Sequence, residues 1–371
     1  MKKIAAFILT TLLLLCGCTS PSQMAGENQV EPPLNETIST DSPIILETAP
    51  PSKSPTIVCT IFPQYDWARQ ILGGQAELFD LILLGNRIDF HNFQPSVDNI
   101  VTISTCDLFI YIGGESDGWV DGVLKNSLNP EMIVLNLLAL LDVDELENFK
   151  ETKGFPQIDP QTNHSNDHHH DHHDDYHDDQ HEDHHDDYHH DHDEEMDEHI
   201  WLSLANAAFL TQLIKDAIIS LDPTNHEIYE ANASAYLAQL QKLDHEYHEI
   251  VKTSAQFTLL CGDRFPFHHL AGDYGLDYYA AFPGCSAETE ASFETIIYLA
   301  GKIDELKLTN LIVTESSDQS IAKTIIGNTL TKDQEISVLD SMQSISATDA
   351  SQITYLAIME NNLKVLREIL K

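Results

Sequence analysis

The sequence predicts an α/β protein of two lobes, each with a central, mostly parallel sheet flanked by helices, joined by one long rigid helix. Three observations lead to this fold class. After residue 55, short apolar runs alternate with helical patterns, which is typical of α/β units around parallel sheets. About 310 residues remain beyond that point, enough for two separate cores. Residues 224–252 contain no Gly or Pro and carry apolar side chains near a 3.6-residue period. Such a helix, about 42 Å long, can reach across two lobes.

The first 18 residues predict a lipoprotein signal peptide. A positive start is followed by an almost unbroken apolar run from Ile4 to Leu15, which is too short for an ordinary membrane span. The run ends in a motif that resembles a bacterial lipobox. Cys18 is the better acceptor of the lipid, because the preceding Gly17 is small. The alternative is a plain cleaved signal peptide. The mature protein is therefore expected to be extracytoplasmic and anchored to the membrane by a lipidated cysteine.

Residues 19–55 are rich in Pro, Ser, Thr, Asn and Glu and predict a flexible tether. The whole chain has a formal charge of −41. Residues 167–198 alone contain sixteen acidic residues and no Lys or Arg. Such a balance argues against nucleic acid or anionic lipid as a partner and favours cations.

The N-terminal lobe is expected over residues 56–222. Apolar runs predict its strands, and amphipathic spacing predicts helices around 66–72 and over 205–221. The predicted strands cover residues 56–61, 77–84, 108–112 and 132–135.

A linking helix over residues 223–253 follows the Asp222-Pro223 break, and the C-terminal lobe is expected over residues 254–371. This lobe repeats the α/β pattern and closes with a predicted helix over 350–370. Its predicted strands cover residues 257–261, 278–282, 310–313 and 335–339.

Four cysteines lie beyond the signal peptide, each at or near a strand-like run: Cys59, Cys106, Cys261 and Cys285. Two precede the acidic stretch and two follow it. One disulfide bond per lobe, Cys59 with Cys106 and Cys261 with Cys285, is the simplest of three connectivities in an exported protein. The alternative is buried thiols. A thiolate metal site is disfavoured, because no Cys-x-x-Cys pair occurs.

Residues 164–192 carry thirteen histidines interleaved with Asp and Glu, within a loop expected over about 159–197. Imidazole and carboxylate are ligands of borderline divalent cations, and dense His tracts favour Zn²⁺, Cu²⁺ or Ni²⁺ over Mn²⁺. A loop that only increased solubility would not need histidine, so we expect it to collect metal without being the specific site. Its collecting residues are His168, His169, His170, His172, His173, His177, His181, His184, His185, His189, His190 and His192.

Two further histidines are placed for a specific metal site. His91 lies just after an apolar strand, in the run 85–96, and His199 lies just after the acidic loop, in the run 197–202. These runs resemble the solute-binding proteins of zinc and manganese ABC importers, the ZnuA/TroA-type family also called cluster A-I. The second run matches that family's Asp-Pro-His-x-Trp-Leu pattern well. The first matches loosely, with Phe90 where proline is usual.

The resemblance covers about residues 56–371 and implies a function. It implies a monomeric receptor that binds zinc with high affinity and delivers it to the membrane permease of an ABC importer. It also implies His91 and His199 as metal ligands. A His-rich acidic loop before the second ligand is typical of the zinc-specific members. Manganese remains possible as the cargo, because the third ligand position departs from the family pattern.

The family places the third ligand, His or Glu, ten residues before the tyrosine of a Tyr-Gly-Leu motif. In this sequence that position is Arg264, a permanent cation that cannot bind metal. Asp263, His268 and His269 are the neighbouring replacements. His268 is the favoured one, because it lies about one helical turn from the lost position.

The fourth ligand of the family is an acidic residue after the last sheet strand, which corresponds to Asp340. Glu315, after the 310–313 strand, is a further candidate, but it could equally cap the following helix. Asp89 and Glu198 are candidates for orienting the two imidazoles. Two imidazoles with a carboxylate form an ordinary Zn²⁺ donor set.

Three alternatives to a zinc receptor stay open on the sequence. One is a manganese-specific receptor of the same family. Another is a surface storage or adhesion protein, in which the histidine-rich loop is the whole function. The last is a zinc hydrolase, which the absence of a recognisable nucleophile or general-base motif disfavours.

Overall fold

The computed structural model describes residues 54–84, 90–141, 197–282 and 291–371. The predicted signal peptide with Cys18, the tether up to residue 53, all thirteen histidines of residues 164–192, Asp89 and Cys285 lie outside the described residues. Residues 53–371 form one compact unit, which contains both predicted lobes.

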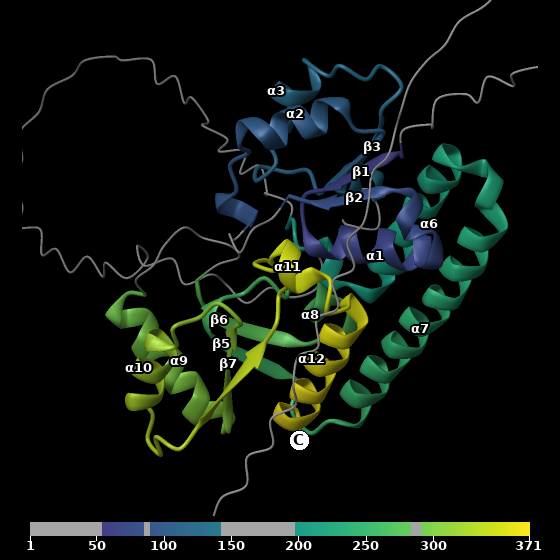
Figure 1. Cartoon of the computed structure of the whole chain (residues 1–371). Coiled ribbons are helices and arrows are strands. Elements are labelled where there is room, and N and C mark those ends of the chain that lie inside the picture. Colours follow the sequence, from purple (N-terminus) through teal and green to yellow (C-terminus); the bar gives the residue numbers. More distant parts are fainter. Residues whose placement is uncertain (1–53, 85–89, 142–196, 283–290) are drawn as a thin grey trace, which may run out of the picture. The chain divides into compact units, whose positions relative to one another are not determined.

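The first sheet has four parallel strands in the order β2-β1-β3-β4 (Figure 1). All four predicted strands are confirmed, three of them shorter than predicted and the fourth shifted by one residue. They are β1 (Thr56–Cys59), β2 (Asp80–Leu83), β3 (Leu108–Tyr111) and β4 (Ile133–Asn136). The helices of this part are α1 (Phe62–Leu72), α2 (Val97–Thr105), α3 (Val120–Leu124), α4 (Leu137–Leu140) and α6 (Leu204–Leu221).

The second sheet repeats this arrangement, with four parallel strands in the order β6-β5-β7-β8. Its strands are β5 (Thr258–Arg264), β6 (Asp277–Phe282), β7 (Asn310–Thr314) and β8 (Glu335–Leu339), all near their predicted positions. Its helices are α8 (His268–Tyr274), α9 (Phe293–Leu306), α10 (Ser320–Gly327), α11 (Ala347–Ala350) and α12 (Tyr355–Ile369). The predicted two-lobed α/β fold class is therefore correct.

The long helix α7 (His226–Thr253) has 28 residues and follows the short 3₁₀ turn η5 (Pro223–Asn225). It packs against α1 and α6 near the first sheet and against α8 and α12 near the second (Figure 1). Its buried side chains, including Tyr229 and Tyr247, recur with the helical period that the sequence predicted. The helix therefore joins the two halves of the compact unit.

The two sheets share one hydrophobic core. A single cluster of buried side chains includes Ile57 of β1 and Leu108 of β3 as well as Leu259 of β5 and Ile312 of β7. Helix α6 is the one described helix long and apolar enough to cross a membrane. Its apolar residues, such as Leu210, belong to this shared cluster, so it packs as a core helix.

The predicted disulfide bond between Cys59 and Cys106 is not present. Both residues are buried, and the thiol of Cys106 donates a hydrogen bond to the carbonyl oxygen of Ile103 at 3.2 Å. Side chains alternate between the faces of a strand. Cys59 accordingly lies in the shared core, while Cys106 packs on the other face of the sheet with Val58. Cys261 is also a buried thiol.

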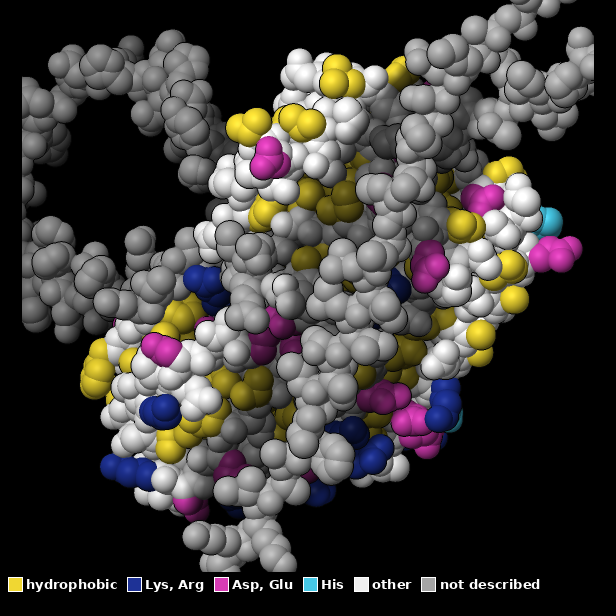
Figure 2. Space-filling view, viewed as in Figure 1, with side chains coloured by type: hydrophobic (Ala, Val, Ile, Leu, Met, Phe, Trp, Pro, Cys, Tyr) yellow, Lys and Arg dark blue, Asp and Glu magenta, His cyan; other side chains and the backbone are white. Residues whose placement is uncertain are grey.

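Exposed apolar side chains lie on helix α2. Val97 and Val101 expose 76% and 55% of their surface. In Figure 2 yellow side chains reach the surface in the region of α2 and α3, whereas Lys and Arg gather mainly over the second sheet and its helices. On this face the positive charges are therefore concentrated over the second half of the unit.

Candidate metal centre

His91 and His199, the two predicted ligands of the first sheet's lobe, lie together. His91 is in the 3₁₀ turn η2 (Phe90–Asn92), and His199 directly precedes the 3₁₀ turn η4 (Ile200–Leu202). Their Nε2 atoms are 3.2 Å apart. Two nitrogen ligands bound at about 2.05 Å to a tetrahedral ion lie about 3.3 Å apart. The pair therefore already has the spacing of two ligands of one ion.

The ring of His199 is oriented by Asp197. The Nδ1 atom of His199 lies 2.7 Å from Asp197 Oδ1, and the backbone N–H of His199 donates to the same oxygen at 2.8 Å. Burial opposes ionisation of Asp197, but His199 and these hydrogen bonds hold the pKa of its carboxyl below the ordinary value. A carboxylate only accepts hydrogen bonds, so Nδ1 of His199 carries the proton and Nε2 keeps its lone pair.

The ring of His91 is oriented by a relay through Ser116. Nδ1 of His91 lies 2.7 Å from the Ser116 hydroxyl oxygen, and that hydroxyl donates to Glu198. The hydroxyl proton is therefore committed to Glu198, and Ser116 accepts from Nδ1–H of His91. Gly114, at φ +77°, leaves the space for this carboxylate, since a Cβ there would lie 2.2 Å from Glu198 Oε1. His91 thus also directs an Nε2 lone pair into the centre.

Aromatic rings surround the two imidazoles. Phe90, which stands where the resembling family has proline, has its centroid 3.8 Å from that of His91 and 5.7 Å from that of His199. Trp201 packs edge-on against Phe90 at 5.3 Å. His199 exposes only 2% of its surface. Packed, buried rings hold the donor atoms in place before any ligand arrives.

Gln343 is the residue that faces both imidazoles from the second lobe. Its Nε2 atom lies 3.4 Å from Nε2 of His91 and forms a shorter contact with Nε2 of His199. This residue was not predicted from the sequence. A single glutamine in a polar run is not a recognisable metal-binding motif. The sequence indicated only its loop, because the fourth ligand was expected after the last strand.

Glu315 lies beside this loop and binds Ser341. The carboxylate of Glu315 accepts the backbone N–H of Ser341 at 2.8 Å and lies 2.9 Å from the Ser341 hydroxyl. The carbonyl oxygen of Ser341 accepts Nε1–H of Trp201 at 2.9 Å, which ties the loop to the other lobe. Glu315, a candidate ligand on the sequence, is thus engaged in hydrogen bonds within its own lobe.

Asp340, the predicted fourth ligand, has other contacts. Its Oδ1 accepts the backbone N–H of Met342 at 2.8 Å, and its backbone is held by Asn362. Burial and the neighbouring charge of Glu315 raise its pKa to about 6. Among its described contacts none joins this carboxylate to either imidazole. Gln343, three residues further along, contacts both imidazoles instead.

Of the residues near the third predicted position, His269 contacts Asp197, the residue that orients His199. Its Nε2–H donates to the carbonyl oxygen of Asp197 at 2.9 Å, so it steadies the residue that orients His199. The favoured candidate, His268, instead has its Nδ1 3.1 Å from the hydroxyl of Tyr278. The two neighbours therefore point to different partners.

Arg264 lies at the carboxyl end of β5, at the same edge of the sheet as Glu315 and the 340–344 loop. Burial is the largest cause lowering the pKa of His91 to about 3, and the charges of His199 and Arg264 lower it further, against the opposing effect of Asp197. His91 is therefore neutral at physiological pH, as a metal ligand must be.

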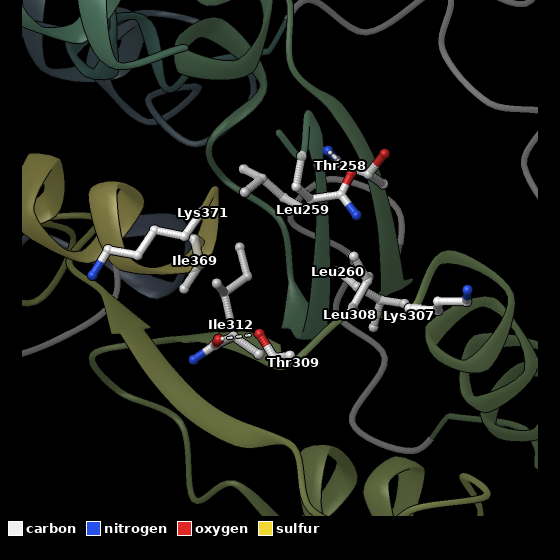
Figure 3. A pocket seen from close by; sticks show the side chains of 11 residues that line it. Thr258, Leu259, Leu260, Lys307, Leu308, Thr309, Ile312, Ile369 and Lys371 are labelled. Carbon is white, nitrogen blue, oxygen red and sulfur yellow. Dashed lines mark hydrogen bonds between the residues drawn. The ribbon is translucent and has the colours of Figure 1, made fainter. Parts of the chain in front are cut away.

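The cavity drawn in Figure 3 lies elsewhere. It has a volume of about 90 Å³ and is lined by Leu259 of β5, by Ile312 of β7, and by Lys307 and Thr309 of the segment before β7. None of the residues around the two imidazoles lines it. The candidate metal centre is thus a set of converging side chains and not this cavity.

Comparison with known proteins places the chain in a family. The family model described as "ZnuA: Zinc-uptake complex component A periplasmic" matches residues 57–369. The zinc-binding lipoprotein AdcA of Streptococcus pneumoniae is 28% identical over 322 residues, which cover 84% of this chain and 55% of that protein. The high-affinity zinc uptake system protein ZnuA of Bacillus subtilis is 26% identical over 315 residues, 85% of this chain and 87% of that protein.

The chain spans about half the length of the AdcA proteins that it matches. The solved structure of the Zn(II)-bound ZnuA-like domain of S. pneumoniae AdcA has the same fold, with a TM-score of 0.60 at 23% identity over 86% of this chain and 99% of that chain. Because the family model covers most of the chain, including both sheets, the two histidines and the 340–344 loop, the chain belongs to the ZnuA family of zinc-uptake components.

Proposed function

We propose that this chain is an extracytoplasmic zinc receptor that delivers the metal to the membrane permease of an ABC importer. The observation that carries the proposal is the facing pair of Nε2 lone pairs on His91 and His199, 3.2 Å apart. Both rings are held by hydrogen bonds from Nδ1, an arrangement typical of imidazoles that bind zinc. The names of the relatives, zinc-binding lipoprotein and zinc uptake protein, support the same cargo.

The proposal includes lipidation at Cys18 and a flexible tether formed by residues 19–55. Together they would keep the receptor near its permease. The histidine-rich loop would collect zinc beside the specific site. The donor set favours zinc over manganese, because imidazole suits zinc while manganese prefers carboxylate oxygen.

Titration calorimetry tests the proposal on the mature protein stripped of metal by a chelator, with residues 164–192 deleted. We expect one tight zinc site to survive the deletion, with manganese binding far weaker. His91→Ala and His199→Ala should each weaken zinc binding by at least about 100-fold, since each removes a ligand of the ion. The matched control is His245→Ala, on the exposed part of α7, which should leave binding unchanged.

Loss of every tight site on deleting the loop would contradict the proposal and favour a storage or adhesion protein. Equal affinity for manganese would instead indicate a manganese receptor. Zinc-dependent hydrolysis of ester or peptide substrates, abolished by His199→Ala, would indicate an enzyme.

A further inference from the structure

Tyr355, the first residue of α12, contacts the segment that carries His199 from the second half of the unit. Its hydroxyl donates a hydrogen bond to the carbonyl oxygen of Trp201 at 2.6 Å. We propose that Tyr355 is a positioning residue, which holds Trp201 and thereby His199 in the arrangement that binds zinc. Asp66 and Arg69 of α1 in turn hold Tyr355. This inference rests on the receptor function proposed above and adds no ligand to the ion.

Trp201 lies two residues after His199, in the turn η4, and its ring supports the metal centre. The centroid of this ring is 5.2 Å from that of His199 and 5.3 Å from that of Phe90. The centroid of Phe90 is in turn 3.8 Å from that of His91. A displacement of Trp201 would therefore change the packing around both imidazoles.

Two hydrogen bonds from the second half of the unit fix Trp201. Its carbonyl oxygen accepts the hydroxyl of Tyr355, and its Nε1–H donates to the carbonyl oxygen of Ser341 at 2.9 Å. All three residues are fully buried. A buried polar group that loses its partner is costly, so each of these bonds strongly favours the observed position of Trp201.

The position of Tyr355 is fixed by Asp66, a fully buried residue of α1. The backbone N–H of Tyr355 is at the N-terminus of α12, where no carbonyl of the same helix can accept it. It donates to Oδ2 of Asp66 at 2.7 Å. The ring of Tyr355 packs edge-on against Trp67, with the centroids 5.4 Å apart. Helix α1 thus determines where α12 begins and where the tyrosine hydroxyl lies.

Arg69 extends this contact to the segment that joins α11 to α12, both of which lie against α1 (Figure 1). Its guanidinium donates to Oδ1 of Asp66 from Nε at 3.1 Å and from Nη2 at 2.5 Å. It also donates to the carbonyl oxygens of Ala350 and Ile353, at 2.5 Å each. A guanidinium has five N–H donors in one plane, whereas the lysine ammonium is a compact group with three. Lysine therefore cannot reproduce all four contacts.

Tyr355→Phe tests the inference on the full mature chain, because it removes the hydroxyl and keeps the ring against Trp67. Zinc affinity is measured by competition with a chelator, and the geometry of the ligands is followed by the visible absorption of Co²⁺. The histidine-rich loop is present in every variant, so it does not contribute to the differences between them. We expect Tyr355→Phe to bind zinc about tenfold more weakly, to release it faster and to show shifted Co²⁺ bands.

Tyr247→Phe is the matched control. Tyr247 is equally buried, and its hydroxyl also donates to a main-chain carbonyl oxygen, that of Met359 in α12 at 2.7 Å. Each variant loses one buried hydrogen bond, so both should unfold at lower urea than wild type. The zinc affinity and the Co²⁺ bands should change only in Tyr355→Phe, because the described contacts of Tyr247 are with Met359 and Tyr274.

A second pair of variants tests the contribution of α1. Arg69→Lys keeps the charge but loses part of the contacts, and should weaken zinc binding by about three- to tenfold. Arg367→Lys makes the same replacement at an exposed position of α12 and should leave zinc binding unchanged. In the Tyr355→Phe background, Arg69→Lys should have little further effect on the zinc affinity, because both residues act through Trp201.

A purely structural role predicts equal effects of Tyr355→Phe and Tyr247→Phe on zinc binding. Affinities of the two variants within about threefold of each other, with identical Co²⁺ bands, would therefore overturn the inference and leave the receptor function intact. Should Tyr355→Phe not fold, equal affinities of Arg69→Lys and Arg367→Lys would overturn it in the same way. If the wild-type chain has no tight zinc site that His199→Ala removes, the receptor function itself fails, and the inference fails with it.

Discussion

At the scale of single residues, the candidate metal centre could be predicted only in part from the sequence. His91 and His199 could be found because each follows a predicted strand or loop in a recognisable motif. The position of Gln343 could not, because its contact with His199 requires the loop after β8 to meet the first lobe, across 144 residues of sequence. Asp340 was the natural choice on residue type, yet its carboxylate caps the backbone of its own loop.

Asp273, on α8, provides a pH prediction at this scale. Burial is the main cause that raises the pKa of its carboxyl to about 7, and the charge of Asp244 raises it further. A hydrogen bond from Ser203 and the charge of His248 oppose this shift. Its Oδ2 atom is buried with no hydrogen-bond partner among the described residues. Below about pH 4 the carboxyl is protonated in the folded and the unfolded chain alike. As the pH rises towards 7, the unfolded chain loses this proton first, so the contribution of Asp273 to stability falls.

Asp273→Asn removes that fall. The free energy of unfolding of the variant minus that of the wild type should therefore increase by on the order of 2 kcal/mol when the pH is raised from 5 to 8. Urea denaturation at the two pH values measures the difference. Asp277→Asn, at an exposed position at the start of β6, is the control and should show no such gain. A stability difference between Asp273→Asn and wild type that is independent of pH would contradict the prediction.

At the scale of helices and strands, most of the fold follows from hydrophobic periodicity. All eight strands and helices α6 and α7 lie where the pattern predicted them. The predicted helix over 350–370 is interrupted, because α11 ends at Ala350 and α12 begins at Tyr355. The hydroxyl of Thr354 accepts a hydrogen bond from the backbone N–H of Ala357 and caps α12. Such a cap favours a new helix start over a continuous helix. The apolar spacing is the same in both cases, so it did not reveal the interruption. The prediction of a disulfide bond between Cys59 and Cys106 was wrong for a similar reason, since cysteine spacing does not reveal which face of a sheet each side chain occupies.

The packing of α10 on β5 depends on Gly262. A Cβ at this position would lie 2.7 Å from the Cβ of Ala322 and 2.7 Å from Cδ2 of Leu311, closer than side chains approach. Gly262→Ala should therefore push α10 from the sheet and lower the free energy of unfolding by about 1–3 kcal/mol.

Gly301→Ala on α9 is the matched control, since nothing lies within 4 Å of a Cβ there. In this exposed helix position alanine should raise stability by about 0.5–1 kcal/mol. Thermal unfolding of both variants measures the two effects. A Gly262→Ala protein as stable as wild type would mean that α10 can move away from β5 without cost.

At the scale of the whole described unit, the shared core determines how the protein unfolds. One cluster contains side chains from both sheets, and α7 packs against helices of both halves. The sequence predicted a helix long enough to join two lobes, but a common core could not be inferred from it, because periodicity shows which face of an element is apolar and not what covers that face. Two lobes with separate cores would unfold independently, whereas a shared core couples them.

The tryptophans provide a built-in test of this coupling. All three, Trp67, Trp119 and Trp201, precede α7 and lie in the half that contains the first sheet, whereas far-ultraviolet circular dichroism reports on helices of both halves. We expect tryptophan fluorescence and circular dichroism to give coincident urea transitions. Zinc should move both transitions to higher urea by the same amount, because binding stabilises only the folded state and the shared core couples the two halves. A fluorescence transition at lower urea than the dichroism transition, or one that alone responds to zinc, would mean that the two halves fold separately.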